Sequence, residues 1–162
     1  MSMVCNYLKL SEAQLAAILE DPETASDLAY PESGEILDAL DLDKSWHLIH
    51  FLLTGETWSG EPPLGNVVLG GTELPETDAG YGPFRYLVPS EVREASNALA
   101  SITAEDLWAR FDAKQVKEAK VYPSPWIGDS TEREYVTQNY EALRRYFTEA
   151  ARSGNAMLLY IS

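Results

Sequence analysis

The sequence predicts an α+β fold in a single compact domain, residues 1–162, with a small mixed sheet, several packed helices, and a long C-terminal helix followed by a terminal strand. Three observations lead to this prediction. Patterns typical of strands and of helices are interspersed along the chain, as expected for a mixed α and β domain. No internal repeat or linker divides the sequence. A chain of 162 residues with 45% hydrophobic content is also long and apolar enough to bury one core.

The first two elements follow from alternation and capping. Residues 3–10 alternate loosely between apolar and polar side chains, which predicts a strand. Ser11, with Gln14 three residues later, predicts a capping box for a helix that continues to about Glu20. Pro22 follows, and proline cannot continue a helical hydrogen-bond pattern, so the helix is expected to end before it.

The next predicted helix is almost wholly apolar. Asp43 is expected to be its N-cap, and Gly55 is expected to end it. Residues 56–66 are polar and contain two adjacent prolines and two glycines, which indicates an exposed loop. Residues 67–69 and 84–88 are apolar enough to predict two short strands.

Short helices dominate the region that follows. A helix is predicted over residues 91–101 with Ser90 as its N-cap, and another begins at Thr103. Residues 114–119 have the pattern of one or two further helical turns. Residues 121–122 are predicted to form a short strand, which the next proline would stop.

The last helix has the clearest pattern. Thr131 and Glu134 predict a capping box at its start, and Gly154 stands where a left-handed C-terminal residue is expected. Residues 156–161 are apolar and predict a buried terminal strand. A seam of apolar side chains at 4-3-4-3 spacing predicts the face of the helix that packs on the core: Val136, Tyr140, Leu143, Phe147 and Ala150.

Four distinctive blocks occur in a fixed order and together span most of the chain. They are Leu40-Asp41-Leu42-Asp43-Lys44-Ser45-Trp46 with His50 and Leu53-Thr54-Gly55; Gly82-Pro83-Phe84-Arg85-Tyr86-Leu87-Val88-Pro89; Trp108-Ala109-Arg110-Phe111-Asp112 with Tyr122-Pro123 and Trp126; and the long helix ending at Gly154-Asn155. This set resembles the YfbM-like family, small bacterial proteins grouped as a domain of unknown function. His47 departs from the family pattern, which does not require histidine there. The resemblance implies a fold; because the family has no assigned activity, it implies no catalytic or binding residue.

The charge of the chain is unevenly distributed. Residues 1–80 carry fifteen acidic residues and two lysines, a net charge of −13, whereas residues 81–162 carry eleven acidic and ten basic residues, a net charge of −1. Ten acidic residues follow one another between Glu12 and Asp43 without an intervening base. Such a surface repels nucleic acid and anionic lipid, so neither is expected as a partner.

A basic protein partner is expected instead, with Glu32, Glu35 and Asp38 as candidate contact residues. A plainer alternative is that the negative charge only keeps the protein soluble. No apolar stretch approaches the roughly 20 residues that span a bilayer, and the single cysteine cannot form an internal disulfide, so a cytoplasmic protein is expected.

Polar side chains gather on one arc of the apolar helix. Asp43, His47, His50 and Thr54 fall within this arc at 100° per residue. Two histidines one turn apart could share a metal ion, or could act as a base oriented by a carboxylate. The alternative is structural, with the imidazole of His50 buried and hydrogen-bonded to backbone. Two histidines and one remote cysteine are few ligands, so neither a metal nor another cofactor is expected.

Aromatic residues beside proline or glycine form a second group of candidates. Tyr86, Tyr122 and Trp126 belong to it, as do Tyr81 and Trp58. Amphipathic rings in such positions line pockets or contact surfaces, although they can equally pack in the core.

Arg85 lies among these rings in the sequence and is a candidate anion anchor. The alternative for Arg85 is a structural pairing with one of the many acidic residues.

Two functions are therefore predicted as rivals. The first is a non-catalytic, acidic binding protein of the inhibitor or immunity type. The second is a small ligand-binding domain or hydrolase with a pocket near His47, His50, Arg85 and Tyr122, to which Thr54, Tyr86 and Trp126 could contribute. The chain has no phosphate-binding glycine loop, no Gly-x-Ser-x-Gly elbow and no His-Glu-x-x-His motif, and this favours the first hypothesis.

Overall fold

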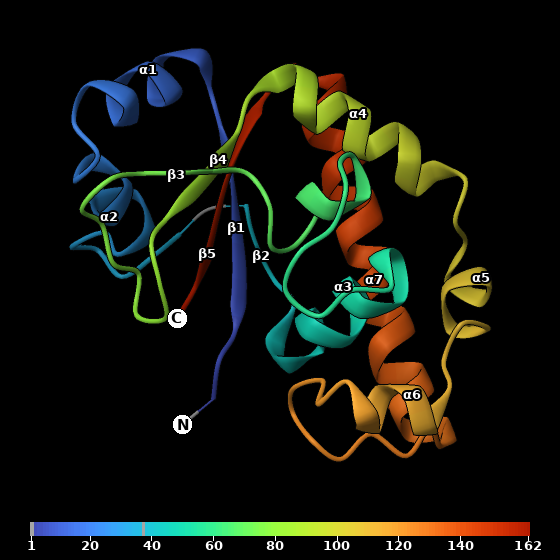
Figure 1. The fold of residues 1–162 in the computed structure, drawn as a ribbon. Coiled ribbons are helices and arrows are strands. Elements are labelled where there is room, and N and C mark those ends of the chain that lie inside the picture. Colours follow the sequence, from blue (N-terminus) through green and yellow to red (C-terminus); the bar gives the residue numbers. More distant parts are fainter. Residues whose placement is uncertain (1, 37) are drawn as a thin grey trace.

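A five-stranded sheet forms the centre of the molecule (Figure 1). The structure, a computed structural model, describes residues 2–36 and 38–162, so Met1 and Leu37 of the predicted domain lie outside the described residues. The strands lie in the order β2-β1-β5-β4-β3. Their bounds are Cys5–Leu10 for β1, Ala39–Asp41 for β2, Thr72–Glu73 for β3, Arg85–Leu87 for β4 and Ala156–Ile161 for β5.

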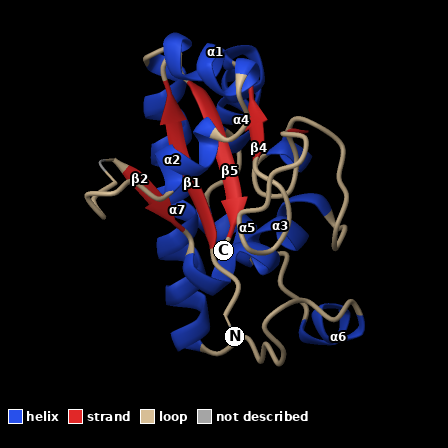
Figure 2. Cartoon of the chain, turned by 90° about the vertical axis from the view of Figure 1, so that its left-hand side faces the viewer, coloured by secondary structure: helices blue, strands red, loops and turns tan. Residues whose placement is uncertain are grey.

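Every strand pairing in the sheet is antiparallel, so the prediction of a mixed sheet is wrong in this detail. The terminal strand β5 lies between β1 and β4, and Tyr7 and Arg85 both lie opposite Leu159. The N-terminal and C-terminal strands thus form the middle of the sheet (Figure 2). The predicted strand at residues 3–10, the strand at 84–88 and the terminal strand are confirmed within one or two residues.

Two predicted strands do not form. Residues 67–69 and residue 122 are bends, and residue 121 has no regular structure. Side chains bond some of the backbone groups that a neighbouring strand would otherwise bond. The carbonyl oxygen of Val67 accepts from the Tyr7 hydroxyl at 2.6 Å, and the Tyr122 N–H donates to the imidazole of His47 at 2.8 Å.

Seven helices surround the sheet within the described ranges, and the predicted α+β fold with a long last helix is confirmed. Their bounds are Glu12–Glu20 for α1, Thr24–Ala29 for α2, Trp46–Thr54 for α3, Pro89–Ala100 for α4, Ala104–Trp108 for α5, Ala113–Glu118 for α6 and Ser130–Arg152 for α7. There are also two 3₁₀ turns. The first, η1, spans Asp43–Ser45 and precedes α3, and the second, η2, spans Leu64–Asn66 in the loop that follows α3. None of these described helices combines the length and apolarity needed to cross a membrane.

Several helix ends match the sequence. The Ser11 and Gln14 capping box at α1 is confirmed in both directions. Thr103 caps α5 in the same reciprocal manner, with Asp106 as its partner. Gly55 adopts a left-handed conformation at the end of α3, with φ +77°.

Three predicted N-caps are wrong. Helix α4 begins at Pro89, whose fixed φ suits the first helical position, and Glu91 accepts the Val88 N–H, so Ser90 lies inside the helix. Helix α7 begins at Ser130, and Asp129 caps it by accepting the Glu132 N–H at 2.9 Å, so Thr131 is not the cap.

Asp43 is the third. Asp43 is the first residue of the turn η1, three positions before α3 begins, and its carboxylate accepts from the Tyr135 hydroxyl at 2.8 Å instead of from an N–H of α3.

The sheet separates two hydrophobic clusters. Helices α1 and α2 cover one face, and α3 to α7 lie on the other side (Figure 1). The larger cluster lies on the α3 and α7 side and includes Trp46, Tyr7 and Leu159, while the smaller includes Ile18 and Leu158. The whole predicted seam of α7 is buried in the larger cluster.

Candidate functional site

His47 is buried inside α3 with both ring nitrogens hydrogen-bonded. Its Nδ1 accepts the Tyr122 N–H at 2.8 Å, so the proton of the neutral ring lies on Nε2, which is 2.9 Å from the carbonyl oxygen of Thr57 and donates to it. Burial lowers the pKa of His47, and the ring is therefore neutral at pH 7. A ring with both nitrogens occupied has no lone pair left for a metal ion or a substrate proton.

His50 lies one turn further along α3 and is also fully buried. Its Nε2 lies 2.7 Å from the carbonyl oxygen of Ser59 and donates to it, and its Nδ1 has no hydrogen-bond partner among the described residues. Burial lowers the pKa of His50 to about 4, and the nearby charge of Arg85 acts in the same direction.

Tyr7 and Arg85 project from the sheet toward the same loop. The Tyr7 hydroxyl donates to the carbonyl oxygen of Val67, and one guanidinium nitrogen of Arg85 donates to the carbonyl oxygens of Val68 at 3.0 Å and Gly70 at 2.7 Å. Arg85 is only 8% exposed, and no carboxylate forms an ion pair with it in the described part of the chain.

These four side chains act as one unit, which we call the loop clamp: His47, His50, Tyr7 and Arg85. Together they bond five carbonyl oxygens of the segment 57–70, which has no helix or strand to satisfy those oxygens except the turn η2. A buried carbonyl without a partner costs free energy, so the clamp lets this irregular segment pack on the core. Tyr7 was missed by the sequence reasoning, because a tyrosine in a strand pattern is indistinguishable from a core residue.

The other predicted pocket residues do not converge on the histidines. The Thr54 hydroxyl donates to the carbonyl oxygen of His50 inside α3. Tyr86 packs against the smaller cluster on the opposite face of the sheet. The Trp126 indole donates to the carbonyl oxygen of Tyr122 at 3.2 Å.

The clefts of about 300–360 Å³ on the surface of the described residues include five whose linings contain none of the predicted pocket residues His47, His50, Arg85 and Tyr122. Thr54 and Trp126 each line one, at different places. Within residues 2–36 and 38–162, no three His, Cys, Asp or Glu side chains gather as a possible metal site.

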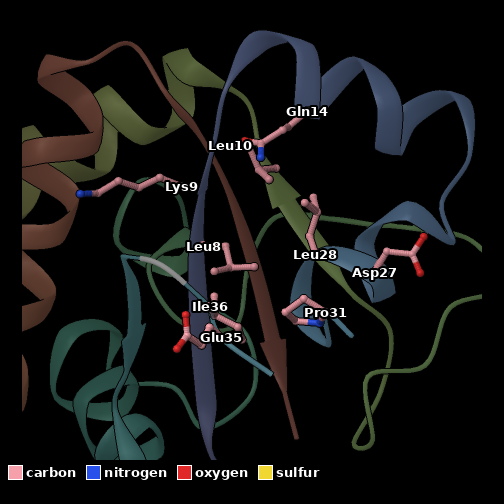
Figure 3. A pocket seen from close by; sticks show the side chains of 9 residues that line it. All are labelled: Leu8, Lys9, Leu10, Gln14, Asp27, Leu28, Pro31, Glu35 and Ile36. Carbon is pink, nitrogen blue, oxygen red and sulfur yellow. The ribbon is translucent and has the colours of Figure 1, made fainter. Parts of the chain in front are cut away.

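One cleft, of about 300 Å³, lies on the other side of the sheet, between β1 and α2 (Figure 3). We call it the acidic cleft. Its lining consists of Leu8, Lys9, Leu10, Gln14, Asp27, Leu28, Pro31, Glu35 and Ile36. Figure 3 shows the leucines and Ile36 around its middle and the carboxylates of Asp27 and Glu35 on opposite sides, while the Lys9 side chain runs away toward α7.

The three predicted contact residues all follow α2 in the chain, and one of them lines this cleft. Glu35 lines it, and Glu32 is exposed in the same connection between α2 and β2. Asp38 is 68% exposed but is paired with Lys9 at 3.0 Å, so one base from β1 does reach the acidic segment.

Comparison with known proteins identifies the family. A model of the family described as a domain of unknown function (DUF1877) matches residues 1–160. Protein YfbM of Escherichia coli strain K12 is 25% identical over 168 residues, covering 99% of each chain. The crystal structure of YfbM from Escherichia coli, a protein of unknown function, has the same fold, with a TM-score of 0.76 at 22% identity over 98% of this chain and 99% of that one. The resemblance seen in the four sequence blocks is thus confirmed: the chain belongs to the YfbM-like family, the domain of unknown function DUF1877.

Proposed function

We propose that the protein is a non-catalytic binding protein whose acidic cleft accepts a basic segment of a protein partner, as an inhibitor or immunity protein does. The observation that carries the proposal is the combination of an apolar floor and an acidic rim in one cleft. Neither feature alone would define a partner, but together they fit a segment that offers an apolar side chain with lysine or arginine beside it.

The floor supplies the apolar part of the contact. Leu8, Leu10 and Leu28 line the cleft beneath Ile36, whose side chain is 37% exposed. An apolar side chain of a partner that entered here would be removed from water on several sides, and such buried anchors dominate binding energy at interfaces.

The rim supplies the charge. Asp27 and Glu35 lie on opposite sides of the floor, and Glu32 is exposed close by in the sequence. None of these three carboxylates is in an ion pair with a described residue. Complementary charge of this kind steers a basic partner toward the cleft and raises its association rate.

The chemistry of the histidines also supports a binding role over catalysis. His47 uses both ring nitrogens in hydrogen bonds, and the free Nδ1 of His50 belongs to a fully buried ring. The rival function, a hydrolase or ligand-binding domain at these residues, would require the segment 57–70 to move away first.

The test compares two variants that change net charge equally. Glu32→Lys with Glu35→Lys reverses the rim of the cleft, and Glu94→Lys with Glu118→Lys reverses two exposed carboxylates in the other half of the chain. Wild-type protein and both variants are immobilised and exposed to lysate of the native cell, and any retained protein is purified and its association rate measured at 0.1 M and 1 M NaCl.

We expect a basic protein retained by the wild type and by the Glu94 and Glu118 variant but lost by the cleft variant. At 0.1 M NaCl, the association rate of this protein with the cleft variant should be at least tenfold lower than with the wild type. With the wild type, the rate should also fall at least tenfold between 0.1 M and 1 M NaCl, because the Debye length shortens from about 10 Å to about 3 Å. Equal retention by all three proteins, an association rate that salt does not change, or no specifically retained protein would contradict the proposal.

A further inference from the structure

Trp58 is the most exposed aromatic side chain of the described residues, at 63%. It lies in the loop after α3, on the side of the sheet opposite the acidic cleft. Tryptophan carries a large apolar ring that folding normally removes from water, so an exposed tryptophan in an ordered loop needs a reason.

The backbone on both sides of Trp58 is fixed by the loop clamp. His47 donates to the carbonyl oxygen of Thr57 at 2.9 Å, and His50 donates to the carbonyl oxygen of Ser59 at 2.7 Å. Two fully buried imidazoles therefore hold the residues immediately before and after the exposed ring.

The ring itself is also held. The centroid of Trp58 lies 4.4 Å from that of His47, and His47 in turn stacks on Trp46 at 5.0 Å. Tyr122 continues the series on Trp46 at 5.6 Å. Trp58 is thus the outermost ring of a stack, supported from the core side and open to solvent on its remaining surface.

Two glycines allow the loop that carries Trp58 to close on itself. A Cβ on Gly65 would overlap the carbonyl of Gly60, and a Cβ on Gly60 would crowd Thr54. The loop therefore folds back on itself at close backbone contact. A side chain that is ordered before binding loses little conformational entropy when a partner arrives, which is the property of aromatic binding anchors.

Two acidic residues lie within three positions of Trp58 in the sequence. Glu56 and Glu61 are exposed on either side of it in the loop, and neither forms an ion pair within the described ranges. The face of an indole ring attracts cations, and guanidinium groups combine this attraction with stacking and hydrogen bonds to carboxylates.

We propose that Trp58, Glu56 and Glu61 form a binding site for an arginine side chain of a protein partner. The guanidinium plane lies on the free face of the indole, and the two carboxylates accept its N–H groups. The clamp histidines are positioning residues, because they touch the loop and not the ligand. This site does not depend on the acidic cleft, which lies on the other side of the sheet.

The test uses two peptides that differ only at the end of one side chain, a guanidinium in acetyl-Gly-Arg-Gly-amide and a neutral ureido group in its citrulline counterpart. Each is titrated into ¹⁵N-labelled protein, and the indole Nε1–H signals of the four tryptophans are followed by NMR. The spectrum of Trp58→Phe assigns the Trp58 signal. Glu56→Gln with Glu61→Gln removes the local carboxylates, and Glu94→Gln with Glu118→Gln removes the same charge elsewhere.

We expect the arginine peptide to shift the Trp58 signal and leave those of the other three tryptophans in place. Binding should weaken at least threefold with the citrulline peptide and in the Glu56 and Glu61 variant, and should stay unchanged in the Glu94 and Glu118 variant. The cleft variant with Glu32→Lys and Glu35→Lys should bind the peptide as the wild type does, which separates this site from the proposed function.

Three results would overturn the proposal. They are an unmoved Trp58 signal at saturating peptide, an equal response to arginine and citrulline, and equal binding by the Glu56 and Glu61 variant and its control.

A second measurement tests the positioning role of His50. His50→Gln, whose amide can still donate to Ser59, should leave the assigned Trp58 indole Nε1–H signal at its wild-type position in the absence of peptide, whereas His50→Leu should shift it.

Discussion

At the scale of single residues, Asp43 shows how a tertiary partner replaces a local one. Its carboxylate accepts from the Tyr135 hydroxyl of α7, and the same hydroxyl accepts the Lys44 N–H at 3.0 Å. Asp43 also has φ +50°, a left-handed conformation that aspartate tolerates better than most residues. Asp43 and Tyr135 therefore join η1 to the long helix.

We predict that the two side chains are energetically coupled. Tyr135→Phe and Asp43→Ala should each lower the free energy of unfolding by about 1–2 kcal/mol, through lost hydrogen bonds and, for alanine, the left-handed backbone. The double variant should cost less than the sum of the two, by about 0.5 kcal/mol or more, because both remove the same bond. Urea denaturation of the four proteins measures this.

Asp43→Asn provides the control for charge. Asparagine keeps an oxygen acceptor and tolerates the left-handed conformation, so its free energy of unfolding should stay within about 0.5 kcal/mol of the wild type. Additive losses in Tyr135→Phe and Asp43→Ala would show that the hydroxyl and the carboxylate act separately.

At the scale of elements, α3 is a buried helix whose two histidines hold the loop that follows it. A histidine whose folded pKa lies below its unfolded value of about 6.5 binds fewer protons when folded, so stability is complete above pH 6.5 and falls as the pH drops toward the folded pKa. The pKa of His50 is about 4, and burial lowers the pKa of His47 in the same direction.

We therefore predict a loss of stability between pH 7 and pH 5. Protonation of His50 in the unfolded chain should by itself lower the free energy of unfolding by about 2 kcal/mol between pH 7 and pH 5. His50→Gln cannot take up a proton, so its stability should change less over the same range. Chemical denaturation at pH 7, 6 and 5 gives the comparison, and identical slopes for the two proteins would assign the acid sensitivity to other groups.

At the scale of the whole molecule, the sheet separates two interaction surfaces. The acidic cleft lies on the α1 and α2 side, and the ring stack ending at Trp58 lies on the α3 and α7 side. With a net charge of −14 and three ion pairs among the described residues, most carboxylates repel one another without local compensation. Self-repulsion of this kind destabilises a compact state.

Salt should accordingly stabilise the fold. Raising NaCl from 0.01 M to 0.1 M shortens the Debye length from about 30 Å to about 10 Å, so the melting temperature at pH 7 should rise by a few degrees. The rise should be smaller in Glu32→Lys with Glu35→Lys, whose net charge is −10 instead of −14. A melting temperature that falls with salt would show that attractive ion pairs outweigh the repulsion.

Much of the secondary structure was determined by the sequence. Three predicted features depend on neighbours within a few residues: the strand that begins at Cys5, the capping box of α1 at Ser11 and the apolar seam of α7. Hydrophobic periodicity and capping motifs report such local contacts directly. The error at Thr131 was of the same local kind, since Asp129 two residues earlier caps the helix instead. The error at Asp43 was not local, because its carboxylate accepts from the Tyr135 hydroxyl, 92 positions away.

The candidate sites were decided by the tertiary structure. His47 bonds Tyr122, 75 positions away, and Tyr7 bonds Val67, 60 positions away, so no spacing rule could reveal that these side chains serve one loop. The sequence by itself determined the fold class, the family blocks and the acidic half of the chain. Only the folded chain decided that the histidines hold the backbone beside an exposed Trp58, because buried carbonyl groups must find donors and the nearest donors come from distant segments.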